Sequence, residues 1–163
     1  MEGHDLASLN DQRDTLLAQK TVIITALADT DAPETGVTPF IHYNGEMFIY
    51  PSRLSSHVRA LLARGSGQFL LVEDEALAQN IWARKRLKFN ASFVEISRDM
   101  PDFAILCDAF ALAHGPTMNL IRDFSDFHML KLLPHSGVLV TGFAKAFAVS
   151  GPDFRITEHL RSG

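Results

Sequence analysis

Short apolar runs alternate with polar turns along most of the chain, and this pattern predicts a sheet of hairpin-connected strands. Residues 21–28 (TVIITALA) are apolar and β-branched, which indicates a buried strand. Residues 36–43 and 46–51 flank Asn44-Gly45, and Asn-Gly suits a type I′ turn because both of its central residues take positive φ. We expect the remaining strands at residues 68–72, 87–96, 127–133 and 137–149, with Pro134-His135-Ser136 separating the last two.

The spacing of apolar residues predicts helices between these strands. Leucines at helical spacing indicate a helix over residues 5–19, and a second helix over residues 55–64 ends at Gly65. Residues 101–114 form the clearest helical pattern, with Asp99 as the expected N-cap. A further helical turn is expected from Gly115-Pro116 through Asp123, and another in the segment that leads to Trp82.

Hairpin-connected strands with helices inserted late favour an antiparallel α+β barrel over a βαβ layer. The chain has 163 residues, 47% of them apolar, and no repeat or linker divides it. We therefore expect one domain over residues 1–163, with an N-terminal helix within 1–19, a helical insertion at 101–123 and final strands at 127–149.

The charge and cysteine content exclude several classes of function. Fifteen Lys and Arg against nineteen Asp and Glu give a net charge of −4, which weighs against general nucleic-acid binding. The single cysteine, Cys107, excludes an internal disulfide and a CxxC site. No apolar run approaches the roughly 20 residues that cross a bilayer, and the N-terminus does not look like a secretion signal. We expect a soluble cytoplasmic protein with neither a nucleic-acid nor a membrane partner.

Sequence motifs for common nucleotide, zinc and hydrolase chemistry are absent. The chain contains no GxxxxGK[ST], GxGxxG, HExxH or GxSxG segment. No two histidines stand at the i, i+2 or i+4 spacing of a local metal site, so a structural zinc is not expected. The seven histidines are His4, His42, His57, His114, His128, His135 and His159.

The densest charge lies in Arg84-Lys85-Arg86, followed by Lys88, at the entry to a predicted strand. Alternation along a strand would send Arg84, Arg86 and Lys88 to one face and Lys85 to the other. Such a face favours an anionic ligand such as phosphate or carboxylate, but it is equally typical of a solvated edge strand. The preceding Glu73-Asp74-Glu75 corner offers neutralising charge.

Hydroxyl groups and a histidine meet where residues 46–51 end and the next helix begins. Ser52, Ser56 and His57 lie there with two arginines, and these are the components of an anion site at a helix start. A helix N-terminus capped by serines explains the same residues equally well.

The segment RDFSDFHML, residues 122–130, has Asp123 and Asp126 on either side of Phe124. A carboxylate can orient a histidine ligand by accepting its second ring N–H. Asp and Ser also commonly cap turns between elements, which is the structural alternative.

Three ordered motifs resemble haem-utilisation proteins related to pyridoxamine 5′-phosphate oxidase. They are PSRLSSHVRALLARG at 51–65, EDEALAQNIWARKRLKFNASFVEI at 73–96 and RDFSDFHMLKLLPHSGVLVTGFAKAF at 122–147. The resemblance covers residues 21–160 and implies an FMN-binding split β-barrel that works as a homodimer, with ligands at the subunit interfaces.

The haem-degrading branch of this family associates the positions of His57, Arg86 and Asp126 with the haem pocket. The resemblance implies an iron ligand just past a helical turn ending in HLxxG, at or after Gly163, and His159 is the last histidine present. The wider superfamily binds FMN, and its phosphate would here meet Ser52, Ser56, Arg84 and Arg86.

We therefore expect a homodimeric haem-binding protein that degrades haem with electrons from a donor and releases iron. The alternatives are an FMN-dependent oxidoreductase like pyridoxamine 5′-phosphate oxidase and a non-catalytic haem carrier or storage protein. Asp126 is the candidate catalytic residue and His159 the candidate iron ligand. The candidate cofactor-binding residues are Ser52, Ser56, His57, Arg84, Lys85, Arg86 and His128.

Overall fold

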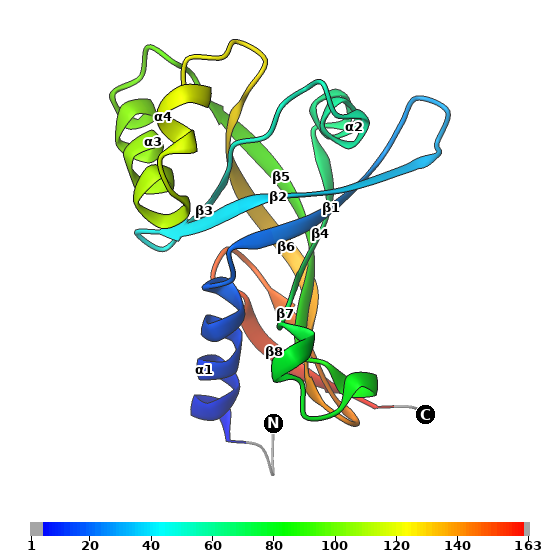
Figure 1. Ribbon diagram of the computed structural model, residues 1–163. Coiled ribbons are helices and arrows are strands. Elements are labelled where there is room, and N and C mark those ends of the chain that lie inside the picture. Colours follow the sequence, from blue (N-terminus) through cyan, green and yellow to red (C-terminus); the bar gives the residue numbers. More distant parts are fainter. Residues whose placement is uncertain (1–4, 162–163) are drawn as a thin grey trace.

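The structure, a computed structural model, describes residues 5–161, in which one sheet and four α-helices make up the fold (Figure 1). The strands are β1 Thr21–Leu27, β2 Pro33–Tyr43, β3 Glu46–Ile49, β4 Ser66–Val72, β5 Arg86–Ile96, β6 Met129–Gly142, β7 Lys145–Ser150 and β8 Arg155–Leu160. The helices are α1 Leu6–Leu17, α2 Ser56–Arg64, α3 Pro101–His114 and α4 Thr117–Ile121, with short 3₁₀ turns η1 Glu75–Leu77 and η2 Ile81–Ala83.

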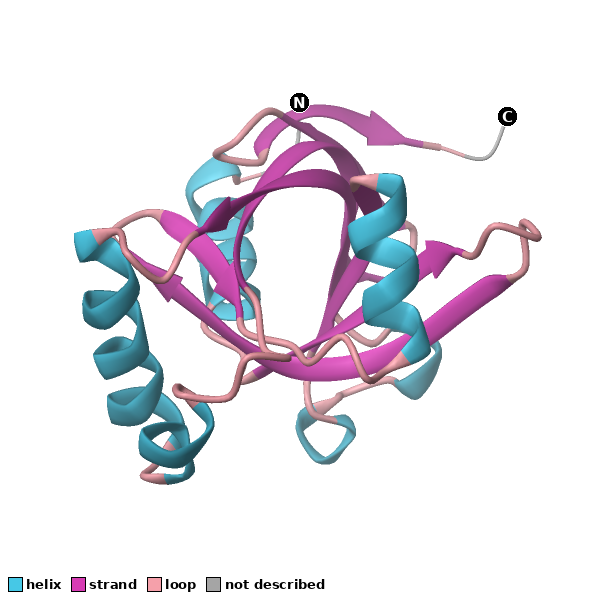
Figure 2. Cartoon of the chain, turned by 90° about the horizontal axis from the view of Figure 1, so that it is seen from above, coloured by secondary structure: helices cyan, strands magenta, loops and turns pink. Residues whose placement is uncertain are grey.

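The strands pair in the order β3-β2-β1-β4-β5-β6-β7-β8, and every pairing is antiparallel. An additional pairing of β3 with β6 closes the first six strands into a barrel, which Figure 2 shows from above. Strands β7 and β8 extend the sheet beyond the barrel wall. The predicted α+β split-barrel fold is confirmed.

Two apolar clusters stabilise this arrangement. The barrel interior is filled by aliphatic and aromatic side chains, among them Phe69, Phe89 and Phe154. A second cluster lies outside the barrel, where α3 packs Phe103 and Phe110 against Tyr50. Burial of these large side chains supplies the main driving force for folding.

The Asn-Gly signal predicted its turn correctly, and a cap that the sequence pattern did not single out begins α1. Asn44 and Gly45 have φ of 51° and 78°, as a type I′ turn requires. The carboxylate of Asp5 caps α1 by accepting the N–H groups of Ala7 and Ser8. Residues 1–4, the first part of the segment 1–19 that was assigned to the N-terminal helix, lie outside the described residues.

The predicted break between the last two strands is wrong, because β6 continues through Pro134-His135-Ser136. Its pairing with β5 shifts register at Asn90/Ala91, opposite this segment, and a bulge accommodates a proline that has no N–H to donate. Close by, a Cβ on Gly137 would lie 2.2 Å from the Lys88 carbonyl oxygen, so the two strands approach closely there. The turn falls instead between Gly142 and Lys145, and β8 is a strand that the sequence pattern did not reveal.

Two predicted helix boundaries also differ. Met100 rather than Asp99 is the N-cap of α3, and the Asp99 carboxylate accepts a hydrogen bond from Ser97. The segment leading to Trp82 forms two 3₁₀ turns instead of an α-helix. In the described part of the chain, no helix is long and apolar enough to span a membrane.

Candidate functional site

The turn after β3 and the loop before β6 are joined by Ser52 and Asp126. The Ser52 hydroxyl donates to Asp126 Oδ2 at 2.5 Å, and the backbone N–H of Arg53 donates to the Asp126 carbonyl at 2.9 Å. Ser52 also forms an isolated β-bridge with Phe127. The Asp126 carboxylate is therefore held in a fixed orientation, and its Oδ1 has no hydrogen-bond partner among residues 5–161.

His128 is fixed beside this pair by two charged neighbours. Its Nδ1 lies 2.9 Å from Glu95 Oε1, and its Nε2 lies 3.2 Å from an Arg53 guanidinium nitrogen. A guanidinium only donates, so Nε2 accepts and the Nδ1–H donates to Glu95. Sequence reasoning did not single out Glu95, because it lies 33 positions from His128 and only the pairing of β5 with β6 brings them together.

The loop that carries Asp126 is anchored by a second arginine, Arg98. Its guanidinium donates to the carbonyls of Arg122, Phe124 and Phe127 and to the Tyr50 hydroxyl. Burial raises the pKa of the Tyr50 phenol, although the hydrogen bond from Arg98 opposes that shift. No local motif marks Arg98, whose partners all come from other segments.

At the start of α2, Ser56 and His57 contact β2. The Ser56 hydroxyl donates to Glu34 Oε2 at 2.9 Å. The His57 ring packs on Gly36 so closely that a Cβ added to Gly36 would lie 2.1 Å from His57 Cε1. Burial lowers the pKa of His57, while the nearby Glu34 acts in the opposite direction. Ser55 is the N-cap residue, but its side chain makes no capping hydrogen bond.

These contacts do not suit the phosphate of FMN. Ser52 and Ser56, the two hydroxyls proposed to hold it, each donate to a carboxylate. A phosphate placed here would meet the negative charges of Asp126 and Glu34, which oppose its binding.

The two arginines of the basic run donate hydrogen bonds to backbone carbonyls. Arg84 Nε donates to the Glu73 carbonyl at 2.6 Å, and Arg86 donates to the Arg84 carbonyl at 2.8 Å. The N–H of Lys85 donates to the Glu73 carboxylate at 2.9 Å. Strand β5 begins only at Arg86, so the predicted alternation holds for Arg86 and Lys88 but not for Arg84.

His159 lies on β8, where a helical turn was expected. Its Nε2 is 2.9 Å from the Ala144 carbonyl, and Arg161 donates to its Nδ1 at 3.2 Å. The ring also stacks on Phe147, with centroids 4.9 Å apart. Ligation of iron through Nε2 would therefore first require loss of the hydrogen bond to Ala144. Residues 162–163, where the resemblance locates the family's ligand, lie outside the described residues.

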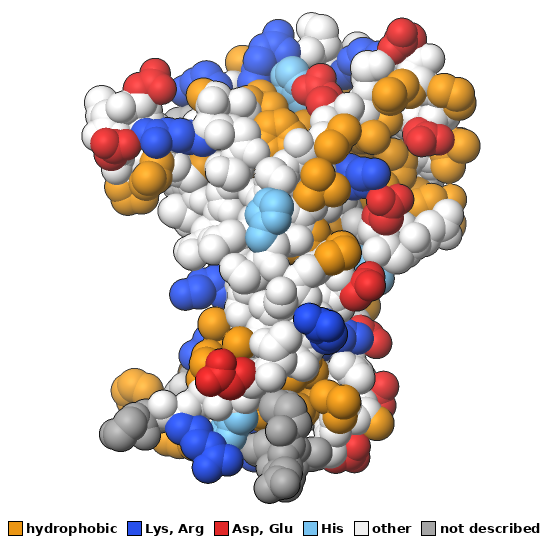
Figure 3. Space-filling view, turned by 180° about the vertical axis from the view of Figure 1, so that it is seen from behind, with side chains coloured by type: hydrophobic (Ala, Val, Ile, Leu, Met, Phe, Trp, Pro, Cys, Tyr) orange, Lys and Arg blue, Asp and Glu red, His pale blue; other side chains and the backbone are white. Residues whose placement is uncertain are grey.

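The sheet register separates the candidates into two groups. Arg86 pairs with Val140, Val140 with Ala146, and Ala146 with Leu160, so the basic run and the end of β8 occupy one end of the sheet. Glu95 and His128 mark the other end, about 30 Å away along β5 at roughly 3.3 Å per residue. One chain therefore brings Ser52, Asp126 and His128 together but keeps them away from Arg86 and His159. Figure 3 shows Lys or Arg, Asp or Glu, His and apolar side chains together at the lower end of the molecule.

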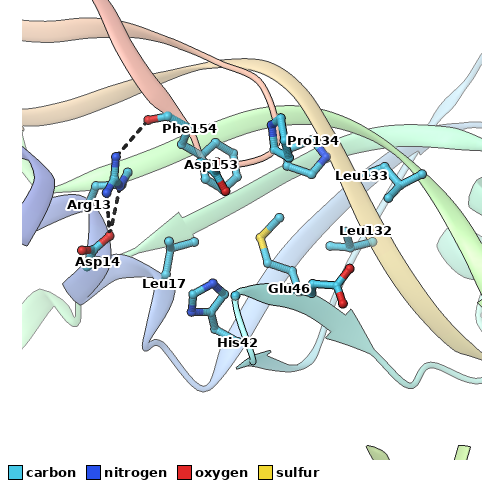
Figure 4. Close-up of a pocket in the computed structure, with 13 residues that line it drawn as sticks. Arg13, Asp14, Leu17, His42, Glu46, Leu132, Leu133, Pro134, Asp153 and Phe154 are labelled. Atoms are coloured by element: carbon cyan, nitrogen blue, oxygen red, sulfur yellow. Dashed lines mark hydrogen bonds and ion pairs between the residues drawn. The ribbon is translucent and has the colours of Figure 1, made fainter. Parts of the chain in front are cut away.

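The first pocket described on the surface is not lined by any of the predicted site residues. A cavity of about 240 Å³ between α1, the β2–β3 hairpin and β6 contains none of them (Figure 4). Arg13 closes one side of it by donating to the Phe154 carbonyl at 3.2 Å. In residues 5–161, no three His, Cys, Asp or Glu side chains are grouped to hold a bare metal ion.

Comparisons with known proteins bear on both fold and family. No protein-family model matches the chain. It is 28% identical over 145 residues to haem oxygenase HutZ of Vibrio cholerae, covering 89% of this chain and 82% of that protein. The structure of Campylobacter jejuni ChuZ matches with a TM-score of 0.86 at 23% identity, over 98% of this chain but only 65% of that chain.

Two further structures have the same fold. One is described as HutZ, the haem storage protein from Vibrio cholerae, with a TM-score of 0.69 and 20% identity over 88% of this chain and 96% of that one. The other, from Clostridium acetobutylicum, is assigned to the pyridoxinephosphate oxidase family, with a TM-score of 0.64 and 14% identity over 90% of this chain and 96% of that one. These matches confirm the resemblance found in the sequence.

Proposed function

We propose that this chain, a HutZ-like protein with the pyridoxamine 5′-phosphate oxidase-like split-barrel fold, binds haem and degrades it oxidatively to release iron. The observation that carries the proposal is the similarity to HutZ, named a haem oxygenase, over 89% of the chain. The single buried cysteine supports a location in the reducing cytoplasm.

The side chains present suit haem in their chemistry. Haem requires apolar surface, cations for its two propionates and an axial ligand. Leu54 and Phe124, 76% and 42% exposed, supply apolar surface in the same two segments as Ser52 and Asp126. Trp82 and Phe143 do so at the end that carries Arg86. Because burial lowers the pKa of His57, its imidazole is neutral near pH 7, the form that binds metals.

A homodimer completes the proposed site. Asp126 and Arg86 lie at opposite ends of one sheet, so they can face the same ligand only if a second copy contributes one of them. Apolar side chains on β1, β2 and β5, Leu27, Val37 and Val94, are 43%, 61% and 44% exposed and offer surface for such a contact. A carboxylate from one copy would then lie near a histidine of the other copy that could bind the iron.

In this proposal the protein would hold and orient the ring, and Asp126 would accept a hydrogen bond from the imidazole that binds the iron. Bound haem supplies the oxygen chemistry and is also the substrate, with electrons from an external donor. Ser52 occupies Oδ2 of Asp126, which leaves Oδ1 to accept the second N–H of an imidazole. A carboxylate in that position fixes the orientation of the ring and increases the basicity of the ligand.

A haem carrier or storage protein is the second candidate function. A structure of HutZ is itself described as that of a haem storage protein. The same residues would bind haem in both cases, so turnover separates the two functions. The FMN-dependent alternative is disfavoured by the two serine–carboxylate contacts, Ser52 to Asp126 and Ser56 to Glu34.

The catalytic role is tested with Asp126→Asn, assayed for ring opening of bound haem under oxygen with ascorbate. We expect turnover to fall about tenfold or more, the usual effect of losing such a partner, while the hemin affinity stays within about threefold of wild type. Asp123→Asn, an exposed carboxylate in the same loop, is the matched control and should react like wild type. Equal turnover in Asp126→Asn and wild type would contradict the role, and haem binding without ring opening in wild type would favour the carrier.

A further inference from the structure

A second pocket lies at the lower end of the barrel, between the 3₁₀ segment and the β6–β7 turn. In Figure 1 these are the short green helices and the orange turn beside them. The pocket has a volume of about 280 Å³, and Lys85, Lys145, Thr141 and Asn80 contribute to its lining. Pockets that enclose drug-sized ligands begin near 300 Å³, so this one suits a small molecule or one end of a larger one.

The buried hydroxyl of Thr141 indicates a ligand, because no hydrogen-bond partner is found for it among the described residues. The residue is 8% exposed, and no group among residues 5–161 hydrogen-bonds to its Oγ1. Thr141 lies between Val140 and Gly142, where the register of β6 with β7 shifts, so that Thr141 itself has no paired residue on β7. Bulges of this kind redirect a side chain and occur beside functional sites. A buried hydroxyl normally makes a hydrogen bond, so we expect the Thr141 hydroxyl to donate to an oxygen atom of a ligand.

Two lysines give the pocket its charge. Neither Lys85 nor Lys145 has an ion-pair partner within the described chain, in contrast to Lys131, whose Nζ lies 3.1 Å from Glu46. Glu73 is the one acidic side chain in the described lining, and its carboxylate already accepts the N–H of Lys85. Two ammonium groups against one carboxylate favour a negatively charged ligand.

Asn80 adds a neutral donor to this set. Its side-chain oxygen accepts the N–H of Trp82 at 3.0 Å, which leaves the amide NH₂ to donate. Phe143, 70% exposed, gives the pocket an apolar wall. Ammonium, hydroxyl and amide donors around one small hollow are the groups that bind phosphate and carboxylate oxygens.

We infer that this pocket binds a small oxyanion, a phosphate or a carboxylate, held by Lys85, Lys145 and Thr141. The anionic ligand suggested by the basic run would thus meet Lys85 rather than the two arginines, whose guanidinium groups contact backbone carbonyls. The oxyanion can be a free small molecule or the carboxylate edge of a larger one such as haem. The inference does not rest on the proposed haem function.

The test is calorimetric titration of the full chain with inorganic phosphate and, separately, with succinate. We expect saturable binding of at least one of these anions, with one site per chain, weakened at least tenfold in Lys85→Gln and Lys145→Gln and several-fold in Thr141→Val. Thr141→Val retains the shape of the side chain and removes only the hydroxyl. Lys20→Gln makes the same change of charge on the loop between α1 and β1 and should bind like wild type. Circular dichroism confirms that each variant is folded.

A parallel hemin titration of the same variants separates the two sources of the oxyanion. Loss of anion binding with unchanged hemin affinity would support a free small molecule. Loss of both, with phosphate or succinate competing against hemin, would support the carboxylate edge of haem. The inference is overturned if neither anion binds saturably and the lysine variants bind hemin like wild type. It is equally overturned if the lysine variants bind the anions as tightly as wild type does.

Discussion

At the scale of single residues, the side chains that can bind a ligand are those with an oxygen or nitrogen atom that no other group of the chain already contacts. Asp126 has one oxygen committed to Ser52, whereas both ring nitrogens of His128 and both of His159 lie within hydrogen-bond distance of other groups. His57 contacts Gly36 with its ring, and burial lowers its pKa. Of the candidate histidines and the candidate catalytic carboxylate, His57 and Asp126 are therefore the ones that a ligand can engage without first breaking these contacts.

The burial of His57 predicts a pH dependence of stability. Because its folded pKa lies below the unfolded value of about 6.5, the unfolded chain binds more protons between the two values. The stabilisation from the neutral ring is therefore fully present above about pH 6.5 and is lost as the pH falls towards the folded pKa. Urea unfolding at pH 7.5 and 5.5 should show a smaller loss of stability in His57→Gln than in wild type.

An exposed histidine provides the control for that measurement. His42→Gln changes a solvent-facing histidine on β2 and should lose as much stability as wild type between the two pH values. If His57→Gln loses as much stability as wild type and His42→Gln, the neutral state of the partly buried His57 ring does not contribute.

At the scale of elements, the loop between α4 and β6 is ordered by arginines that belong to other segments. Arg53 donates to the carbonyl of Ser125, and Arg98 donates to three further carbonyls of the same stretch. Arg98 also lies over the Phe103 ring, 4.9 Å from its centroid, which connects the loop to α3. The position of Asp126 therefore depends on contacts made far from it in the sequence.

Replacement of Arg98 should loosen this loop. Arg98→Ala removes several charge-assisted hydrogen bonds at a solvent-exposed site, and we expect a loss of about 1.5 kcal/mol in the free energy of unfolding. Arg64→Ala removes an exposed ion pair with Asp31 and should cost less than about 1 kcal/mol. Urea denaturation measures both variants, and an equal effect of the two would show that Arg98 does not anchor the loop.

The elements that the sequence predicted well are those specified by adjacent residues. Asn44-Gly45 sets its turn through the φ angles of two neighbouring residues, and α3 follows from its own apolar spacing. Pro134 misled the prediction because a bulge in the pairing with a distant strand accommodates it. Strand β8 is short and mostly exposed, so it carries little hydrophobic pattern, and pairing with β7 defines it.

The same distinction applies to the candidate site. Asp126 and His128 were found because they share one motif, and Ser52 because it follows a strand end. Glu95 and Arg98 were missed because they reach these residues only through the folded sheet. The separation of Arg86 from Asp126 likewise follows from the length of β5, which residue types do not encode.

At the scale of the whole molecule, the two groups of candidate residues predict a dimer. The ends of the sheet lie about 30 Å apart, so a site that uses both ends needs two copies. Sedimentation velocity at micromolar concentration should show a single species of twice the chain mass. A stable monomer under these conditions would exclude a ligand site shared between subunits.

Whether this chain binds haem is measured by a hemin titration followed by absorbance, with FMN titrated in parallel. We predict a saturable Soret band at one haem per chain and no quenching of FMN fluorescence. FMN quenching without a Soret band would contradict the account and support the flavin-dependent alternative.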